Sequence, residues 1–407
     1  AARYSERAMT SPTDLLDLLI TGIDRVLPDA QEVRRTLHRR PELGGEEDAT
    51  RGTLQSLLDW LTWRPVAGTG MYGRLGPAGP AVGLRAEMDA LPIVERTGVE
   101  WASERPGVMH ACGHDVHMAA LWATLTAARA LDLPVGLVPI FQPREEISPS
   151  GAIDIVEAGL LGQESVRAMI GVHLQPRVVE GVISTGAGAV NAAFDEFYVT
   201  VHGQPGHGAY PHTTIDPIGI LASIIVGVNE LASRAIDPTH ATVMSIGRIE
   251  GGNAPNVIAG TAYAAGTIRT TDDRDREQLH HDLRRLVELT AAARGATAEL
   301  SIVPGGSMLV NDAALVHAID PLIDHTGVPR APRPFRSCGS DDFSAYCEVV
   351  PSVMMFAGTG TVAGLTERVQ VGLHHERFLP PDDALRLCAY AFAAGYAGAS
   401  ELVGRAS

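Results

Sequence analysis

Near the start of the chain, from residue 15, apolar residues recur at the spacing of an amphipathic helix. Ser11 precedes them, and serine is a residue type that caps helix N-termini. Four apolar residues share one helical face: Leu15, Leu19, Ile23 and Val26. A second helix is predicted from about residue 30, and it should end before Pro41 because the residue that precedes a proline disfavours helical backbone.

Three short apolar runs, at 82–86, 135–141 and 169–174, predict buried strands because they have strand length and lie between helical patterns. The clearest of these helical patterns covers 117–131. Strands that alternate with helices predict a layered α/β domain with a largely parallel central sheet. In such sheets, functional side chains collect at the carboxyl ends of the strands.

A different order of predicted strands and helices follows the third apolar run. The predicted elements are strands near 197–201, 241–250, 261–270 and 297–303, and helices near 216–235 and 275–294. This β-α-β-β-α-β order is the ferredoxin-like arrangement. We therefore predict that a complete small domain, 190–303, is inserted into a larger α/β domain formed by 1–189 and 304–407.

Composition narrows the class of protein. With 407 residues, 45% hydrophobic and 20% charged, the chain is typical of a globular protein of two or three domains. The net charge of −16 disfavours nucleic acid as a partner. Four cysteines are too few for a disulfide scaffold, which favours a reducing, cytoplasmic location. The apolar stretch 119–141 contains Arg129 and Asp132, so no membrane span is predicted there, and residues 1–10 lack the apolar core of a signal peptide.

The densest polar cluster is HACGHDVH at 110–117. Cys112 and His114 are two positions apart, so in an extended segment their side chains lie on one side and could bind a metal ion. Two other interpretations stay open at this point. Cys112 could be a buried free cysteine beside solvated histidines, or a nucleophile served by a neighbouring histidine.

Further polar groups follow other apolar runs. Glu145 and Glu146 come after the run 135–141, and adjacent carboxylates at a strand end are expected to point in roughly opposite directions, one to a cation and one to a substrate. His173 falls within the third run, and His374 and His375 lie near the other terminus. Each of these residues alone is more often structural or solvated than functional.

Taken together, five donors lie at or near the ends of predicted core elements: Cys112, His114, Glu146, His173 and His374. They exceed the needs of one catalytic ion, which keeps an open position. Two divalent ions sharing a water would use all of them. Thiolate and imidazole ligands favour zinc, and manganese, cobalt or nickel also suit such a site.

These motifs resemble the M20 family of metallopeptidases and aminoacylases, in particular its amidohydrolase branch of hippurate hydrolases and N-acyl-amino-acid deacylases. The resemblance covers nearly the whole chain, from LHRRPEL (37–43) to LH (373–374). The other shared motifs are LRAEMDALP (84–92), HACGHD (110–115), FQPREE (141–146), GHGAYPH (206–212), NVI (256–258), GTIR (266–269), GSDDF (339–343) and GTG (358–360).

The resemblance implies that the five donors are the metal ligands and that Glu145 is the general base. This base takes a proton from the metal-held water and delivers it to the leaving amine. His207 resembles a histidine that crosses from a partner subunit to stabilise the developing oxyanion. Arg269 and Asn256 resemble residues that hold the carboxylate end of the substrate. A small inserted domain that acts as lid and dimerisation surface is also implied.

Several positions depart from the family pattern. Glu87 and Asp341 each replace the acid that is more often seen, which leaves the role of the nearby Asp89 open. The segment 147–151 is one residue longer than the usual glycine-rich turn. The proline that commonly follows the last ligand is absent, so His375 competes with His374 for that position.

The sequence thus predicts a metal-dependent amidohydrolase that cleaves N-acyl amino acids or related small conjugates, and that forms a homodimer or higher homo-oligomer. A dipeptidase or an N-carbamoyl-amino-acid hydrolase on the same scaffold is the alternative. A cysteine hydrolase using Cys112 and a catalytically silent metal- or ligand-binding protein are the remaining rivals. Neither nucleic acid nor membrane is predicted as a partner.

Overall fold

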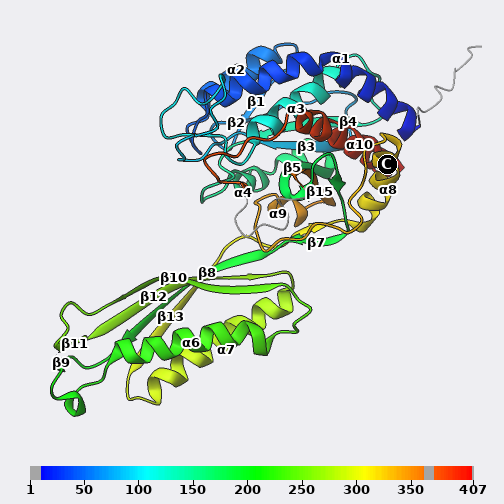
Figure 1. Cartoon of the computed structure of the whole chain (residues 1–407). Coiled ribbons are helices and arrows are strands. Elements are labelled where there is room, and N and C mark those ends of the chain that lie inside the picture. Colours follow the sequence, from blue (N-terminus) through cyan, green and yellow to red (C-terminus); the bar gives the residue numbers. More distant parts are fainter. Residues whose placement is uncertain (1–10, 362–370, 406–407) are drawn as a thin grey trace, which may run out of the picture. The chain divides into compact units, whose positions relative to one another are not determined.

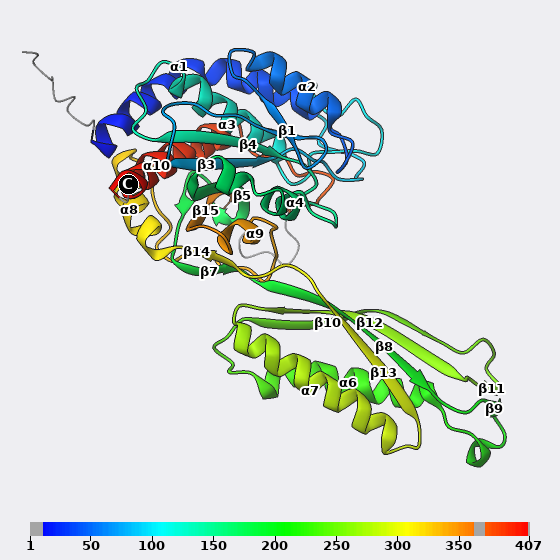
Figure 2. The same ribbon diagram turned by 180° about the vertical axis from the view of Figure 1, so that it is seen from behind.

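The computed structural model describes residues 11–361 and 371–405. The prediction for residues 1–10 lies outside this part of the chain. The chain divides into two compact units, each described here by itself (Figures 1 and 2). Unit 1 consists of Ala1–Gly188, Val310–Phe335 and Asp342–Ser407, and unit 2 of Ala189–Leu309 and Arg336–Asp341.

Unit 1 contains a mixed seven-stranded sheet with the order β1-β2-β4-β3-β5-β15-β6. Its strands are β1 (Arg64–Val66), β2 (Gly70–Tyr72), β3 (Ala81–Glu87), β4 (Gly136–Gln142), β5 (Val166–Val179), β6 (Ile183–Ser184) and β15 (Ser352–Gly360). Parallel pairing joins only β4, β3, β5 and β15. The prediction of a mostly parallel sheet is therefore too simple. The loop from β1 to β2 is too short for a crossover, so these two outer strands are antiparallel.

Helices cover both faces of this sheet. They are α1 (Pro12–Arg39), α2 (Asp48–Leu57), α3 (His114–Ala128), α4 (Gly151–Glu157), α5 (Leu160–Gln163), α8 (Ala313–His325), α9 (Ser344–Cys347) and α10 (Asp383–Arg405). Figures 1 and 2 show α1, α3 and α10 on one face and α4 and α9 on the other. Nearly every residue of α3 is buried, because it lies between α1, α10 and the sheet.

The two helices predicted at the start of the chain are one helix, α1. Ser11 caps it by accepting a hydrogen bond from Asp14 N at 3.1 Å. The helix continues through Pro28, although a proline inside a helix costs about 3 kcal/mol. Aliphatic residues on both sides of Pro28, among them Ile23 and Val33, pack into the same core. Burial contributes about 1.5–3 kcal/mol for each such side chain, which outweighs that cost.

Unit 2 contains a four-stranded antiparallel sheet with the order β10-β12-β8-β13. Its main elements are β8 (Ala193–His202), α6 (Pro217–Ala235), β10 (Thr242–Gly251), β12 (Thr261–Thr270), α7 (Asp273–Ala292) and β13 (Thr297–Pro304). The helices α6 and α7 pack on one face through a separate apolar core. A short ribbon of β9 (Gly206–His207) and β11 (Val257–Ile258) extends from one end of the sheet (Figure 1). The remaining elements of the chain are η1 (Pro211–Thr213) and two strands that pair with each other, β7 (Gly188–Asn191) and β14 (Leu309–Asn311).

Unit 2 extends beyond the predicted insertion of 190–303 at two places. Gly305 N donates to Phe194 O at 3.0 Å, and Ser337 N donates to Val190 O at 2.9 Å. These backbone bonds attach chain segments beyond residue 303 to the beginning of the small domain. Apolar periodicity does not reveal such attachments, because they involve main-chain groups only.

Within the described residues, α6 is the one helix long and apolar enough to cross a bilayer by length and composition alone. The apolar stretch 119–141, for which no membrane span was predicted, is a different part of the chain. In the structure one face of α6 packs on the sheet of unit 2 through Ile220, Leu221, Ile224 and Val228. Its outer face remains exposed.

Candidate metal centre and associated groups

Four segments of unit 1 bring the five predicted donors together. Cys112 Sγ lies 3.5 Å from His173 Nε2. Glu146 Oε1 lies 3.1 Å from His374 Nε2 and 4.0 Å from His114 Nε2. The potential ligand atoms of Cys112, Glu146 and His374 all lie within 4.8 Å of one another. All five residues therefore lie together near the end of the parallel strands, and His374 is the exposed member of the group.

The turn that carries Cys112 and His114 is not the extended segment that the spacing suggested. Gly113 has φ +85°, in the left-handed region that favours glycine, and His114 is the first residue of α3. A Cβ atom at Gly113 would lie 2.6 Å from Leu174 Cδ1. Glycine is therefore required here both for the backbone angle and for the close approach to β5.

The adjacent carboxylates also differ from expectation. Glu145 and Glu146 do not diverge, because potential ligand atoms of both lie within 4.8 Å of one another and of His114 Nε2. They follow β4 in an irregular loop, where the alternation of an extended strand does not apply. Glu146 thus belongs to two groups of donors, one with Cys112 and His374 and one with His114 and Glu145.

Backbone carbonyl groups determine which nitrogen carries a proton in two of the three candidate ligand histidines. His114 Nδ1 lies 2.8 Å from Asp89 O, and His173 Nδ1 lies 2.7 Å from Leu174 O. A carbonyl oxygen only accepts, so each Nδ1 is the donor. In the neutral rings, Nε2 therefore carries the lone pair, which is the form that binds a metal ion.

Asp89 supports the centre from outside the donor set. Its Oδ2 accepts a hydrogen bond from Glu146 N at 2.9 Å, while its carbonyl oxygen holds His114. One residue thus fixes a carboxylate loop and an imidazole ring. The role that the sequence left open for Asp89 is positional in this structure.

The charges around the donors favour a cation. Burial alone would lower the pKa of His114, yet Asp89 and Glu87 raise it to about 10. Burial raises the pKa of the Cys112 thiol well above its usual range, and Glu146 and Glu145 raise it further. Without a metal ion the thiol is protonated, which disfavours Cys112 as a nucleophile.

Two buried atoms test whether these residues fit a metal ion. His114 Nε2 and Glu146 Oε1 are inaccessible to solvent; the nitrogen has no hydrogen-bond partner, and the oxygen has only its ion-pair contact with His374. Buried polar atoms without a partner are costly, and coordination to a cation would satisfy both. Thiolate, imidazole and carboxylate groups are all zinc ligands, so the donor set fits a divalent ion.

The structure also distinguishes two adjacent histidines. His375 Nδ1 accepts a hydrogen bond from Arg377 N at 3.1 Å and so serves its own loop. His374 faces Glu146 instead, and its backbone N–H donates to Ala111 O at 2.8 Å. His374 is therefore the better candidate ligand.

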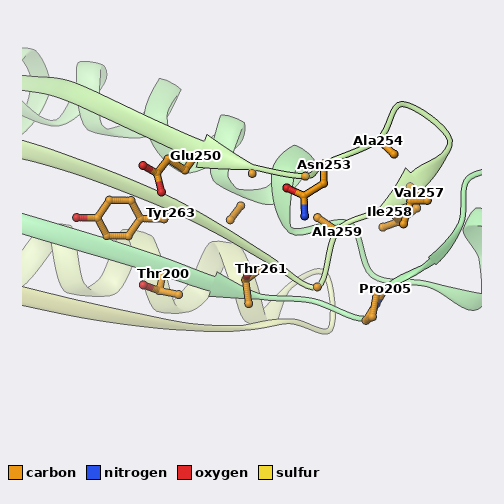
Figure 3. Close-up of a pocket in the computed structure, with 14 residues that line it drawn as sticks. Thr200, Pro205, Glu250, Asn253, Ala254, Val257, Ile258, Ala259, Thr261 and Tyr263 are labelled. Carbon is orange, nitrogen blue, oxygen red and sulfur yellow. The ribbon is translucent and has the colours of Figure 1, made fainter.

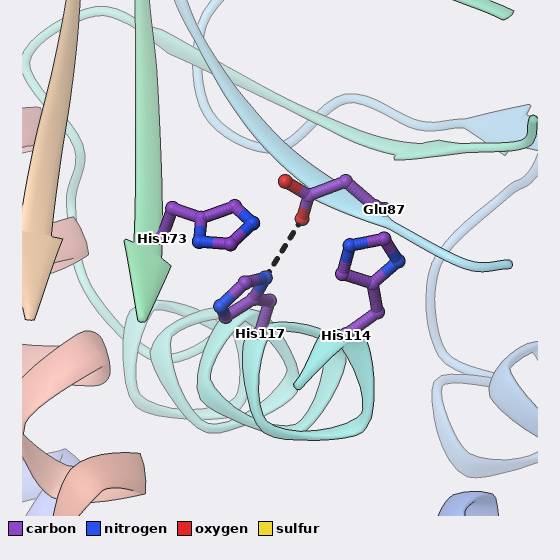
Figure 4. Close-up of side chains that lie close together, drawn as sticks. All are labelled: Glu87, His114, His117 and His173. Atoms are coloured by element: carbon purple, nitrogen blue, oxygen red, sulfur yellow. Dashed lines mark hydrogen bonds and ion pairs between the residues drawn. The ribbon is translucent and has the colours of Figure 1, made fainter. Parts of the chain in front are cut away.

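Sequence reasoning missed the part that Glu87 and His117 play beside the donors (Figure 4). Both side chains are fully buried, and potential ligand atoms of both lie within 4.8 Å of those of His114 and His173. His114 and His117 are three positions apart on α3, a spacing that places two side chains on one helix face. That spacing is the signal that could have identified His117.

The other predicted residues lie in unit 2. His207 is exposed on β9, and its Nδ1 accepts a hydrogen bond from Ala209 N at 3.1 Å. Asn256 lies close by, because its carbonyl accepts from Gly208 N at 2.8 Å. Arg269 lies near the opposite end of β12 and donates to Cys338 O at 3.0 Å. The structure thus brings His207 and Asn256 together and leaves Arg269 apart from them.

A cavity of about 890 Å³ lies beside the ribbon in unit 2 (Figure 3). Its lining includes Glu250, Asn253, Val257 and Tyr263. None of the residues predicted for chemistry lines it. The cavity therefore adds no catalytic group to the candidate site.

A buried ionic network supports the N-terminus of α3. Asp115 Oδ2 lies 3.0 Å from His38 Nδ1 and 3.3 Å from Arg34 Nε. His38 Nε2 lies 3.2 Å from Glu95 Oε1. Burial by itself would lower the pKa of His38, but Asp115 and Glu95 raise it to about 9. The network thus ties α1 and the loop that contains Glu95 to the helix that begins with His114.

Residues 83–394 match the model of peptidase family M20/M25/M40. The chain belongs to this family, as its motifs indicated. Among curated relatives, the N-acetyl-L-cysteine deacetylase of Bacillus subtilis (strain 168) is 35% identical over 334 residues, covering 80% of this chain and 79% of the relative. The N-acyl-L-amino acid amidohydrolase of Geobacillus stearothermophilus is 37% identical over 296 residues, covering 71% of this chain and 80% of the relative.

A solved structure agrees with these relatives. The Bacillus subtilis YXEP protein, described as a dinuclear metal-binding peptidase of the M20 family, superposes with a TM-score of 0.80 at 31% identity. The match covers 93% of this chain and 99% of that protein. The overall α/β architecture is thus shared along nearly the whole length of both chains.

The raised pKa of His38 predicts a pH dependence of stability. The pKa in the folded state, about 9, lies above the ordinary 6.5. The stabilisation is therefore complete below about pH 6.5 and is lost as the pH rises through about 9, on the order of 3 kcal/mol in all. Calorimetry across this range should show a falling thermal midpoint in the parent and a flatter profile in His38→Gln. Equal slopes would show that His38 is not the titrating group.

Proposed function

We propose that the chain hydrolyses the amide bond of N-acyl amino acids or related small conjugates, using a metal-activated water. The observation that carries this proposal is the convergence of the five donors and Glu145 in unit 1. Family membership and the names of the relatives support the reaction class. The bound ions would lower the pKa of the water and polarise the carbonyl oxygen of the substrate. Cys112, His114, Glu146, His173 and His374 would hold them.

Glu145 is proposed as the general base. Its carboxylate lies 4.0 Å from His114 Nε2 and so borders the proposed ions. It takes a proton from the attacking water and gives it to the nitrogen of the leaving amine, which completes the cleavage of the C–N bond. A single carboxylate can serve both steps because the proton that it accepts from the water is the one that it donates to the amine.

His207 suits stabilisation of the oxyanion. Its Nδ1 accepts the Ala209 amide hydrogen, so in the neutral ring Nε2 carries the proton and can donate outward. A donor aimed at the oxygen on which charge develops accelerates amide hydrolysis. Asn256, on the same ribbon, and Arg269 are proposed to bind the carboxylate of the substrate.

The separation within unit 2 supports a homodimer. Arg269 is eight residues along β12 from Thr261, which is roughly 26 Å of extended strand. Thr261 pairs with His202 of β8, and the chain continues from there to His207 on the ribbon. One small substrate cannot span this distance. His207 and Asn256 of one subunit are therefore proposed to complete the site of its partner.

The outer face of α6 is the proposed contact surface. No charged residue occurs between Pro217 and Asn229. Val226 is 61% and Ile218 42% exposed on this face. The neighbouring strand β10 is an open edge of the sheet and exposes Ile249. An uncharged apolar helix beside an unpaired strand edge suits a second copy of this chain.

Unit 2 is proposed to have the ferredoxin-like arrangement and to act as lid and dimerisation domain. Zinc or manganese is proposed as the metal, with two ions per subunit, and cobalt or nickel as substitutes. A cytoplasmic location is proposed, and the four free cysteines are compatible with its reducing conditions. A dipeptidase or an N-carbamoyl-amino-acid hydrolase remains the alternative activity.

A matched pair of variants tests the roles of the two glutamates. Glu145→Gln should lower kcat by about 10²–10⁴-fold because it removes the proton acceptor, yet keep the parent's metal content. Glu146→Gln should lose bound metal as well as activity. Metal analysis and initial rates on purified proteins provide both readouts. Parental turnover by Glu145→Gln would rule out this residue as the general base.

A substrate panel separates the alternatives. We expect the highest kcat/KM among acetyl- and benzoyl-amino acids, and lower values for carbamoyl-amino acids and dipeptides. A chelator should abolish activity and added Mn²⁺ or Zn²⁺ should restore it, whereas iodoacetamide should leave the metal-loaded enzyme active. Inactivation by iodoacetamide together with indifference to chelators would favour a cysteine hydrolase.

Substitutions on two helices test the dimer. Val226→Asp, on the outer face of α6, should convert a dimer into monomers and lower activity because the partner's contribution to the site is lost. Leu289→Asp is the matched control, because Leu289 is 60% exposed on α7. Light scattering with chromatography measures the mass. A dimeric Val226→Asp protein would place the interface elsewhere.

A further inference from the structure

His117 lies among the proposed ligands, yet both of its ring nitrogens are bonded within the protein. Leu174 N donates to His117 Nε2 at 3.0 Å. A nitrogen that accepts carries no proton, so Nδ1 is protonated and donates to Glu87 Oε2, 2.9 Å away (Figure 4). The ring is therefore neutral and has no lone pair left for a cation. His117 is not a ligand in this arrangement.

The main chain of Leu174 connects His117 to a proposed ligand. Its N–H donates to His117, and its carbonyl accepts from His173 Nδ1 at 2.7 Å. The pairing of β5 with β3 ends at Gly171, three residues earlier. A side chain from α3 thus bonds the backbone of β5 where β3 no longer does.

Glu87 anchors the other end of this chain of hydrogen bonds. It is fully buried, and one oxygen pairs with Arg85 while the other accepts from His117. Arg85 also pairs with Asp342 at 2.5 Å. Glu87 therefore has a fixed orientation, and a carboxylate in that position can only accept from His117. This fixes the tautomer that allows His117 to accept from Leu174.

We propose that Glu87 and His117 are positioning residues that act through the main-chain N–H and C=O of Leu174 to hold His173 ready for metal binding. The inference rests on the proposed metal centre and adds two residues outside its ligand set. Groups that orient a ligand histidine typically contribute 10–100-fold to metal affinity. We call the hydrogen bonds from Glu87 through His117 and the main chain of Leu174 to His173 the relay. Its loss should weaken metal binding even without substrate.

Two substitutions of His117 separate positioning from packing. His117→Phe keeps a ring of similar size but leaves Leu174 N and Glu87 Oε2 without a partner. His117→Gln keeps one amide oxygen to accept and one N–H to donate, so it is the conservative rescue. Thr124→Val is a control for general weakening of α3, because it removes the bonds from Thr124 Oγ1 to Ala120 O at 2.9 Å and to Ala389 O at 3.5 Å, neither of which involves the donors.

The experiment titrates metal-free, full-length protein with Co²⁺ and follows the absorbance of the thiolate–Co²⁺ bond at Cys112. We expect about 10–100-fold weaker binding for His117→Phe. His117→Gln and Thr124→Val should bind within a few-fold of the parent. Thermal melting of the metal-free proteins checks that each variant folds. If His117→Phe does not fold, Glu87→Gln replaces it, and we expect this variant to bind Co²⁺ several-fold more weakly than the parent.

Two results would overturn the relay. One is parental Co²⁺ affinity in folded His117→Phe, or in Glu87→Gln if it is used. The other is equal weakening in His117→Phe and Thr124→Val, which would reduce the effect to stability. A parent protein that binds no Co²⁺ through a thiolate would instead contradict the proposed metal centre itself, so the two failures are distinguishable.

Discussion

The candidate metal centre depends on two main-chain carbonyl groups that decide where its histidines keep their protons. The carbonyls of Asp89 and Leu174 each take the Nδ1 hydrogen of a ring, and the opposite nitrogen of that ring is left to face the donors. Both carbonyls belong to segments fixed by the central sheet. The sheet therefore selects the tautomers, and folding arranges the donors before any cation arrives.

The two units divide the proposed chemistry between them. Unit 1 holds the five candidate donors and Glu145, the proposed base, where burial and neighbouring carboxylates favour a cation. Unit 2 carries His207 on the ribbon beyond one end of its sheet and Arg269 near the other end of β12, too far apart for one small substrate to contact both. The same unit has an uncharged helix face beside an open strand edge. Both observations support the proposal that activity requires a second subunit.

Local patterns predicted most elements because apolar periodicity reports which face is buried. The strand 261–270 agrees with β12, and the helix 216–235 differs from α6 by one residue. Local patterns predicted two helices at the start of the chain, but packing on both sides of Pro28 stabilises a single helix. The convergence of Glu145 and Glu146 depends on an irregular loop, which has no periodicity. His117 was missed because its partners come from β3 and β5, distant in sequence.

The discontinuity of unit 1 has a consequence for biosynthesis. Its central strand β5 pairs with β15, which emerges from the ribosome only after all of Ala189–Leu309. Most of the smaller unit is contiguous and can fold first, whereas one edge of β5 stays unpaired in the nascent chain. Exposed strand edges invite aggregation. Interrupted translation after the smaller unit would thus leave a product for chaperones or proteases to remove.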